Sequence, residues 1–255
     1  MKRIAVFCGS NKGTRAAYAA AAENLGSQLA KHGIELVYGG GCVGLMGILA
    51  DAALKNGGHV IGVIPQSLVI RKVVHKKLPD LRVVKNMHER KALIAELSDG
   101  FIALPGGYGT CEEFCEVLAW SQLGYHQKPF GLLDVAGFYR PMLQFFDHAV
   151  AEGFIRPAHR ELILVEEDAE KLLHRLETFQ PPAEVKWIRK TPGKFLPRIH
   201  TDGHEYGKLS VGGARHSVRA VARICSGGGQ RTPINREQAA RPAAFIRVNP
   251  CQSVV

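Results

Sequence analysis

Residues 100–113 of the chain read Gly100-Phe101-Ile102-Ala103-Leu104-Pro105-Gly106-Gly107-Tyr108-Gly109-Thr110-Cys111-Glu112-Glu113. The apolar start predicts a buried strand, and the periodicity from Glu112 to Tyr125 predicts an amphipathic helix. A glycine turn between the two lets backbone N–H groups approach a ligand, and the helix N-terminus adds about half a positive charge. The sequence therefore predicts an anion site. Because two carboxylates follow, one of them is expected to face positive charge that develops on a phosphorylated substrate.

Short apolar runs and longer periodic segments alternate along the chain to about residue 178. This alternation predicts a doubly wound, Rossmann-like parallel sheet with helices on both faces, and an α/β fold in which ligands bind beyond the carboxyl ends of the strands. Gly33 and Gly57 stand where helices are expected to end. The predicted strands are 4–8, 35–38, 60–64, 81–84, 101–104, 130–133 and 162–165, and the predicted helices are 14–31, 44–56, 89–97, 112–125, 141–152 and 168–178.

The net charge of +10 is unevenly distributed along the 255 residues. Residues 191–255 hold 10 Lys and Arg against 3 Asp and Glu, whereas the remaining 190 residues hold 23 against 20. We therefore expect a catalytic domain over residues 1–188 and a basic, Gly- and Arg-containing C-terminal tail over residues 189–255, disordered or loosely packed. Basic tails that are poor in aromatic residues are commonly solvated, so nucleic-acid binding by the tail is not favoured.

No apolar run approaches the roughly 20 residues that a membrane-spanning helix needs, and residues 1–10 read as a buried strand rather than a signal peptide. We therefore expect a cytoplasmic protein that does not bind membranes. The cysteines form no C-x-x-C pair and are expected to be free thiols, and the histidines lack H-x-x-x-H spacing, so neither a metal nor a cofactor is expected. The cysteines are Cys8, Cys42, Cys111, Cys115, Cys225 and Cys251.

A second glycine-rich segment, residues 39–44, follows a predicted strand and matches the G-x-G-x-x-G pattern of dinucleotide-binding turns. About twenty residues later, where such sites place a ribose-binding carboxylate, the chain reads Val63-Ile64-Pro65. An NAD site is therefore not expected, and the lack of G-x-x-x-x-G-K-[ST] disfavours a Walker ATPase. A contact with a smaller nucleotide and a packing role for these glycines both remain open.

Arg90 shares one face of a predicted helix with three apolar residues, close to the helix N-terminus. A cation there is partly desolvated and lies at the positive end of the helix dipole. We therefore expect an anion beside it, either a substrate phosphate or one of Glu112 and Glu113, and a purely structural ion pair is the alternative. The neighbouring Lys91 is read as a phosphate contact or a solvated residue.

Glu113 and Glu116 lie three residues apart and are expected to share a helix face. A carboxylate in the first turn of a helix is expected to keep a low pKa, which suits a group that stabilises positive charge or activates water. Capping of the helix by Glu112 is the alternative explanation for one of the glutamates.

These segments together resemble the LOG ("Lonely Guy") family of cytokinin riboside 5'-monophosphate phosphoribohydrolases. The family's mark is P-G-G-x-G-T-x-x-E, here Pro105 to Glu113, preceded by an Arg-Lys pair, here Arg90 and Lys91. The resemblance covers about residues 1–188. Members have often been labelled lysine decarboxylases, but no pyridoxal-phosphate site is recognisable. Further matching segments are Phe7-Cys8-Gly9-Ser10, Gly39-Gly40-Gly41, Trp120-Ser121-Gln122-Leu123-Gly124 and Lys128-Pro129-Phe130-Gly131-Leu132-Leu133.

The resemblance implies hydrolysis of the N-glycosidic bond of an adenosine 5'-monophosphate, N6-modified in the cytokinin-activating type, by a homodimer or larger homo-oligomer with its site near the subunit interface. Arg90 and Glu113 would be the catalytic pair, with Glu113 stabilising an oxocarbenium-like transition state and positioning water. Arg90 would hold the nucleotide or ease charge on the departing base, and the glycine turn would hold the 5'-phosphate. The implied substrate-binding residues are Lys91, Gly106, Gly107, Tyr108, Gly109, Thr110, Glu112, Gly9, Ser10, Gly40, Gly41 and Met87.

Two positions depart from the family pattern. Lys72 stands where some members have a glutamate that contacts substrate, and Ala119 stands where a threonine is expected. The alternative to hydrolysis is a carrier of a nucleotide or a phosphate-bearing cofactor on the same fold. The Arg90–Glu113 pair argues against a carrier, because a protein that only carries a polyanion gains little from Glu113.

Overall fold

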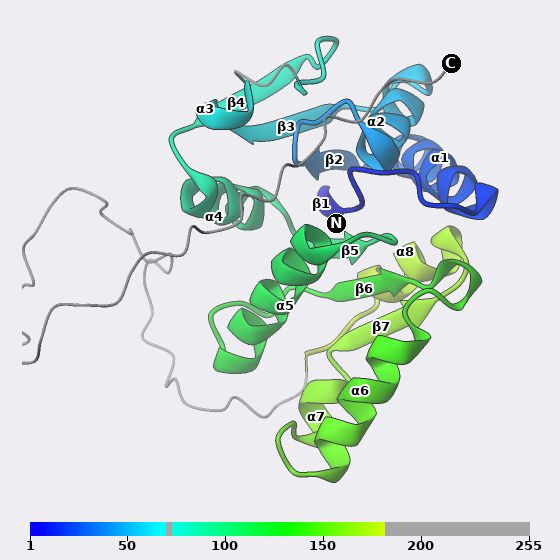
Figure 1. Ribbon diagram of the computed structural model, residues 1–255, viewed down its shortest axis with the longest axis vertical. Coiled ribbons are helices and arrows are strands. Elements are labelled where there is room, and N and C mark those ends of the chain that lie inside the picture. Colours follow the sequence, from blue (N-terminus) through cyan, green and yellow to red (C-terminus); the bar gives the residue numbers. More distant parts are fainter. Residues whose placement is uncertain (70–72, 182–255) are drawn as a thin grey trace, which may run out of the picture. The chain divides into compact units, whose positions relative to one another are not determined.

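The centre of the fold is a parallel β-sheet (Figure 1). The computed structural model describes residues 1–69 and 73–181, and within them the sheet has seven strands in the order β4-β3-β2-β1-β5-β6-β7. From β1 the chain therefore builds outward on one side and then, from β5, on the other. The strands are β1 (Arg3–Phe7), β2 (Glu35–Tyr38), β3 (Val60–Pro65), β4 (Asp80–Val84), β5 (Gly100–Ala103), β6 (Phe130–Leu133) and β7 (Ile163–Glu166).

Helices cover both faces of the sheet (Figure 1). Successive strand residues point to opposite faces, so that Ile4 and Val6 pack in one apolar layer, whereas Ala5 and Phe7 pack in the other. The first layer is covered by α1, α2 and α8, and the second by α4, α5 and α6. The helices are α1 (Ala16–Lys31), α2 (Gly44–Lys55), α3 (Gln66–Val69), α4 (Met87–Leu97), α5 (Tyr108–Leu123), α6 (Arg140–Ala151), α7 (Pro157–Arg160) and α8 (Ala169–Glu177), with the 3-10 turn η1 (Val135–Gly137).

The predicted fold class is confirmed, and each predicted strand has its counterpart in the sheet. Gly33 and Gly57 follow helix ends with φ of 65° and 78°, as expected of glycines that terminate helices. The predicted start of α5 is wrong, because the helix begins at Tyr108 and not at Glu112. The short elements α3, η1 and α7 were not predicted.

No helix of the described residues is long and apolar enough to cross a membrane. The predicted domain boundary near residue 188 and the predicted tail lie outside the described residues.

Candidate functional site

The turns that follow β1 and β5 lie side by side at the carboxyl end of the sheet. These strands are neighbours, but the chain leaves them in opposite directions, which is the switch point where ligands bind in such sheets. The Gly9 N–H donates to the Pro105 carbonyl at 3.0 Å, and the Leu45 N–H donates to the Gly9 carbonyl at 3.0 Å. The turn after β1 is therefore held between the start of α2 and the glycine turn before α5.

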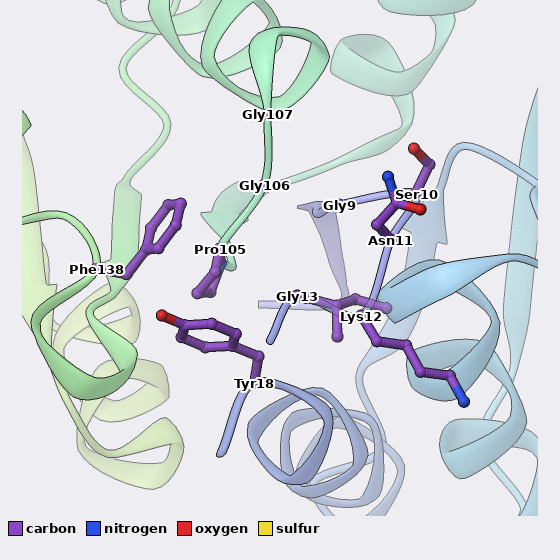
Figure 2. Close-up of a pocket in the computed structure, with 11 residues that line it drawn as sticks. Gly9, Ser10, Asn11, Lys12, Gly13, Tyr18, Pro105, Gly106, Gly107 and Phe138 are labelled. Atoms are coloured by element: carbon purple, nitrogen blue, oxygen red, sulfur yellow. The ribbon is translucent and has the colours of Figure 1, made fainter. Parts of the chain in front are cut away.

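A cavity of about 220 Å³ opens at these turns. Tyr18 and Phe138 form an edge-to-face ring pair, with centroids 5.8 Å apart, along one side of it, and Pro105 lies beside the pair (Figure 2). Ser10 and Asn11 lie on the other side, and the amine of Lys12 points away from the rings (Figure 2). The lining residues are Gly9, Ser10, Asn11, Lys12, Gly13, Tyr18, Leu45, Pro105, Gly106, Gly107 and Phe138.

The N-terminus of α5 faces open space beside this cavity. Gly107 is the N-cap residue, and among the described residues no side chain caps the helix and no acidic residue lies in its first turn. A Cβ added at Gly107 or Gly109 would meet no described atom within 4 Å. The first N–H groups of a 16-residue helix are thus available to an anion, and Lys12 is the charged residue among those that line the cavity.

Arg90 and Glu113 form a buried ion pair, also at the carboxyl end of the sheet. Nη1 of Arg90 donates to Oε1 of Glu113 at 2.6 Å, and Nε donates to the Val63 carbonyl at 3.1 Å. Only 10% of the Arg90 side chain and 12% of the Glu113 side chain are exposed. The expected anion beside Arg90 is therefore Glu113, supplied by the helix that follows the glycine turn.

Gly39 makes room for the Arg90 guanidinium. A Cβ on Gly39 would lie 2.2 Å from Nη2 of Arg90, a distance that atoms in folded proteins do not adopt. From the sequence, a nucleotide contact and a packing role both remained open for the glycines of residues 39–44. The close approach of Arg90 favours the packing role at Gly39. Gly40 and Gly41 do not line the cavity, and a Cβ on Gly41 would lie 2.9 Å from the Met46 side chain.

Burial raises the pKa of Glu113 above its ordinary value, although Arg90 beside it pulls the pKa down. The expectation of a low pKa is therefore wrong. Because α5 begins at Tyr108, Glu113 lies in the second turn, away from the free N–H groups, and the cost of burying its charge outweighs the attraction of the guanidinium.

Lys91 also pairs with carboxylates of α5. Its amine donates to Glu112 and, at 3.1 Å, to Oε1 of Glu116. Burial lowers the pKa of Lys91, but the hydrogen bonds to Glu112 and Glu116 outweigh this effect and raise it overall. The alternative explanation that Glu112 caps the helix does not hold, since Glu112 lies in the second turn and binds Lys91.

The remaining predicted residues are spread around the glycine turn. Thr110 is buried beneath it, so close that a Cβ on Gly106 would lie 2.1 Å from the threonine Oγ1. Tyr108 is 97% exposed at the first position of α5, and Met87 is exposed at the first position of α4. The structure thus brings Gly9, Ser10, Gly106 and Gly107 into one cavity and leaves the others outside its lining.

Several cavity residues were missed by sequence reasoning. Asn11, Lys12 and Gly13 directly follow the segment Phe7-Cys8-Gly9-Ser10, so continuing that segment by three residues finds them. Tyr18 was assigned only to the periodic face of a helix. Phe138 comes from the turn after β6, and the sequence has no signal for it.

The structure describes only one of the two positions that depart from the family pattern. Lys72 lies outside the described residues, and Ala119 is exposed on α5.

The described cysteines, Cys8, Cys42, Cys111 and Cys115, are free thiols. Within residues 1–69 and 73–181, no group of three or more His, Cys, Asp or Glu is placed to hold a metal ion.

Sequence comparison finds close relatives over most of the chain. A family model described as "Possible lysine decarboxylase" matches residues 46–176. The chain is 50% identical over 202 residues to the cytokinin riboside 5'-monophosphate phosphoribohydrolase LOG of Oryza sativa subsp. japonica, a match that covers 78% of this chain and 84% of the rice protein. It is also 50% identical over 190 residues to LOG1 of Arabidopsis thaliana, which bears the same enzyme name, covering 74% and 89% of the two chains.

Solved structures with the same fold include molybdenum cofactor proteins. The carrier protein of Chlamydomonas reinhardtii matches with a TM-score of 0.54 and 24% identity, over 69% of this chain and 96% of that one. The molybdenum cofactor binding protein of Rippkaea orientalis matches with a TM-score of 0.54 and 23% identity, over 70% and 97%. At this identity the likeness shows the fold alone.

Proposed function

Because the chain belongs to the LOG family of cytokinin riboside 5'-monophosphate phosphoribohydrolases, we propose that it hydrolyses the N-glycosidic bond of adenosine 5'-monophosphates, including N6-modified ones. The products are the free base and ribose 5-phosphate. The single observation that carries the proposal to particular residues is the buried Arg90–Glu113 ion pair, whose Nη1 and Oε1 atoms lie 2.6 Å apart. It lies at the carboxyl end of the sheet, where the cavity also opens at the switch point.

In the proposed reaction the bond between C1' of the ribose and the purine nitrogen breaks, and the oxygen of water bonds to C1'. The ribose carries positive charge in the transition state, and ionised Glu113 stabilises that charge and positions the water, whose proton it accepts. Arg90 eases the negative charge on the departing purine, which finally takes up the proton. Val63, Gly39 and Glu113 hold the guanidinium in one place, so its charge is in position before the bond breaks.

We place the 5'-phosphate at the cavity. The N–H groups at the start of α5 and the turn after β1, with Gly9 and Ser10, face this space, and Lys12 supplies a cation at its rim. Gly106, Gly107, Tyr108, Gly109 and Thr110 build the helix start and its turn. Binding energy from the phosphate then orients the ribose toward Glu113. Met87, Gly40 and Gly41 do not line the cavity, and we propose from the family resemblance alone that they lie toward the base.

We further propose that the enzyme works as a homodimer in the cytoplasm, with residues 1–188 as its catalytic domain. The exposed apolar side chains of Phe145 on α6 and of Phe154 support an interface with a second copy. Free cysteines support a reducing compartment.

The test is direct incubation of the purified full chain with AMP and, separately, with isopentenyladenosine 5'-monophosphate. Free base and ribose 5-phosphate are followed by chromatography. Glu113→Gln is the matched variant, because it keeps the size of the side chain but removes its charge. We expect it to abolish turnover while nucleotide affinity stays within about tenfold, since ground-state binding relies on the cavity.

Base release by the unchanged enzyme that is lost in the variant supports the proposal, and the ratio of the two rates gives the preferred base. Turnover unchanged by Glu113→Gln removes Glu113 from the mechanism. Binding of both nucleotides without base release contradicts hydrolysis and favours a carrier.

A further inference from the structure

Lys91 joins α4 to α5 immediately beside the Arg90–Glu113 pair. Its amine pairs with Glu112 and lies 3.1 Å from Glu116, two residues on successive turns of α5. Only 13% of the Lys91 side chain is exposed, whereas 55% of the Glu112 side chain is. The amine is thus sandwiched between the helices, and two of its three donors are already used.

The charge around Lys91 is unsuited to a phosphate. The cluster holds two cations, Arg90 and Lys91, and three carboxylates, Glu112, Glu113 and Glu116, so its formal balance is −1 when all are ionised. A phosphate at the Lys91 amine would lie next to Glu112 and Glu116, and like charges at such short range repel one another. The same balance favours a group that becomes positive, as the ribose does in the proposed reaction.

We infer that Lys91 is a positioning residue and not a phosphate ligand: it fixes α5 against α4 and offsets the charge of the carboxylates that surround Glu113. The inference rests on the proposed function, because Glu113 matters only if it acts on the ribose. The two members of the Arg-Lys pair then have different roles. Arg90 contacts Glu113 and acts on the departing purine in the proposed reaction. Lys91 acts only through Glu112 and Glu116.

The groups around Glu113 give this role a measurable consequence. Facing Glu113 are Arg90 and Lys91 from α4, Glu112 from its own helix, and Cys8, just after β1. Burial raises the pKa of Glu113, Arg90 and Lys91 lower it, and Glu112 raises it. Removing the amine leaves two carboxylates without a counter-charge, so the pKa of Glu113 rises and the enzyme needs a higher pH to ionise it.

The experiment compares Lys91→Met with the unchanged enzyme and with Lys55→Met. Lys55 is exposed at the end of α2, so this control loses the same charge away from the site. kcat/KM for AMP is measured from about pH 4 to pH 9, and inhibition by ribose 5-phosphate is measured near neutral pH. For Lys91→Met we expect the acidic limb to move up by about half a pH unit or more, and the inhibition constant to stay within about twofold.

A double variant tests the inference with a pH shift in the opposite direction. Glu112→Gln with Glu116→Gln leaves the amine without carboxylates, so the acidic limb is expected to move to lower pH. This result does not depend on whether Lys91→Met folds, which a thermal melt reports. Ribose 5-phosphate inhibition weakened about tenfold by Lys91→Met, or acidic limbs that stay in place in both variants, overturns the inference. An unchanged enzyme that releases no base contradicts the proposed function instead.

Discussion

Glu113 is the residue whose ionisation limits the proposed reaction. Burial holds its pKa above the ordinary value of a glutamate, about 4.3. Since the proposed reaction uses the ionised form, kcat/KM is expected to fall as the pH drops through this raised pKa. The acidic limb should therefore lie above the ordinary pKa of a glutamate in a profile of kcat/KM for AMP.

A limb at or below the ordinary pKa of glutamate would contradict this prediction, because it would mean that Arg90 outweighs burial. The Lys55→Met variant is again the control, since a charge lost from the far end of α2 should not move the limb.

Single residues also mark the limit of what the sequence predicts about the site. The face shared by Arg90 and three apolar residues predicts an anionic partner, and Glu113 is that partner. The direction of the Glu113 pKa was mispredicted, because burial depends on how α4, α5 and β1 pack together. The two partners of Lys91 were missed for a similar reason, as the alignment of two helices is set by the whole core.

Among the elements, α4 offers a test of how firmly Arg90 is held. Its N-cap, Asn86, accepts a hydrogen bond from the Glu89 N–H at 2.9 Å. Asn86→Ala is expected to cost about 1 kcal/mol in the free energy of unfolding and also to lower kcat, because the first turn of α4 carries Arg90. Denaturant unfolding and AMP hydrolysis measure the two effects.

The matched control is Asp168→Ala in α8, whose N-cap side chain accepts from the Lys171 N–H at the same distance of 2.9 Å. A similar loss of stability with unchanged kcat is expected, since α8 does not contribute to the site. Equal losses of kcat in both variants would show that general stability, and not the position of Arg90, explains the effect.

Element boundaries show why α5 was predicted to begin four residues late. Tyr108, Gly109 and Thr110 lack the apolar periodicity of the later turns, so the pattern begins only at Glu112. The helix nevertheless starts at Tyr108, where the buried Thr110 packs beneath Gly106. The strands were predicted more accurately, because each is a short apolar run bounded by turn residues. The elements α3 and α7 have four residues each, too few for a periodic signal.

At the scale of the whole molecule, the described part of the chain contains both apolar layers and every residue assigned to the site. Deletion of residues 191–255 is therefore expected to leave AMP hydrolysis and the melting temperature nearly unchanged. Loss of folding or activity would show that the tail takes part in either. Salt-sensitive binding of DNA or RNA that disappears with the deletion would assign the tail to nucleic acid.

The order of the strands has a consequence for how the protein is made. Residues 1–97 supply the half-sheet β4-β3-β2-β1 and Arg90, whereas Glu113 arrives only with the other half. During translation, β1 remains an open edge until β5 leaves the ribosome more than ninety residues later, a wait of about 5 to 20 seconds. An unpaired edge strand with exposed apolar side chains is prone to aggregate. Until β5 and Glu113 have been synthesised, the nascent chain thus lacks a complete site. During the same time its open sheet edge makes protection by a chaperone most useful.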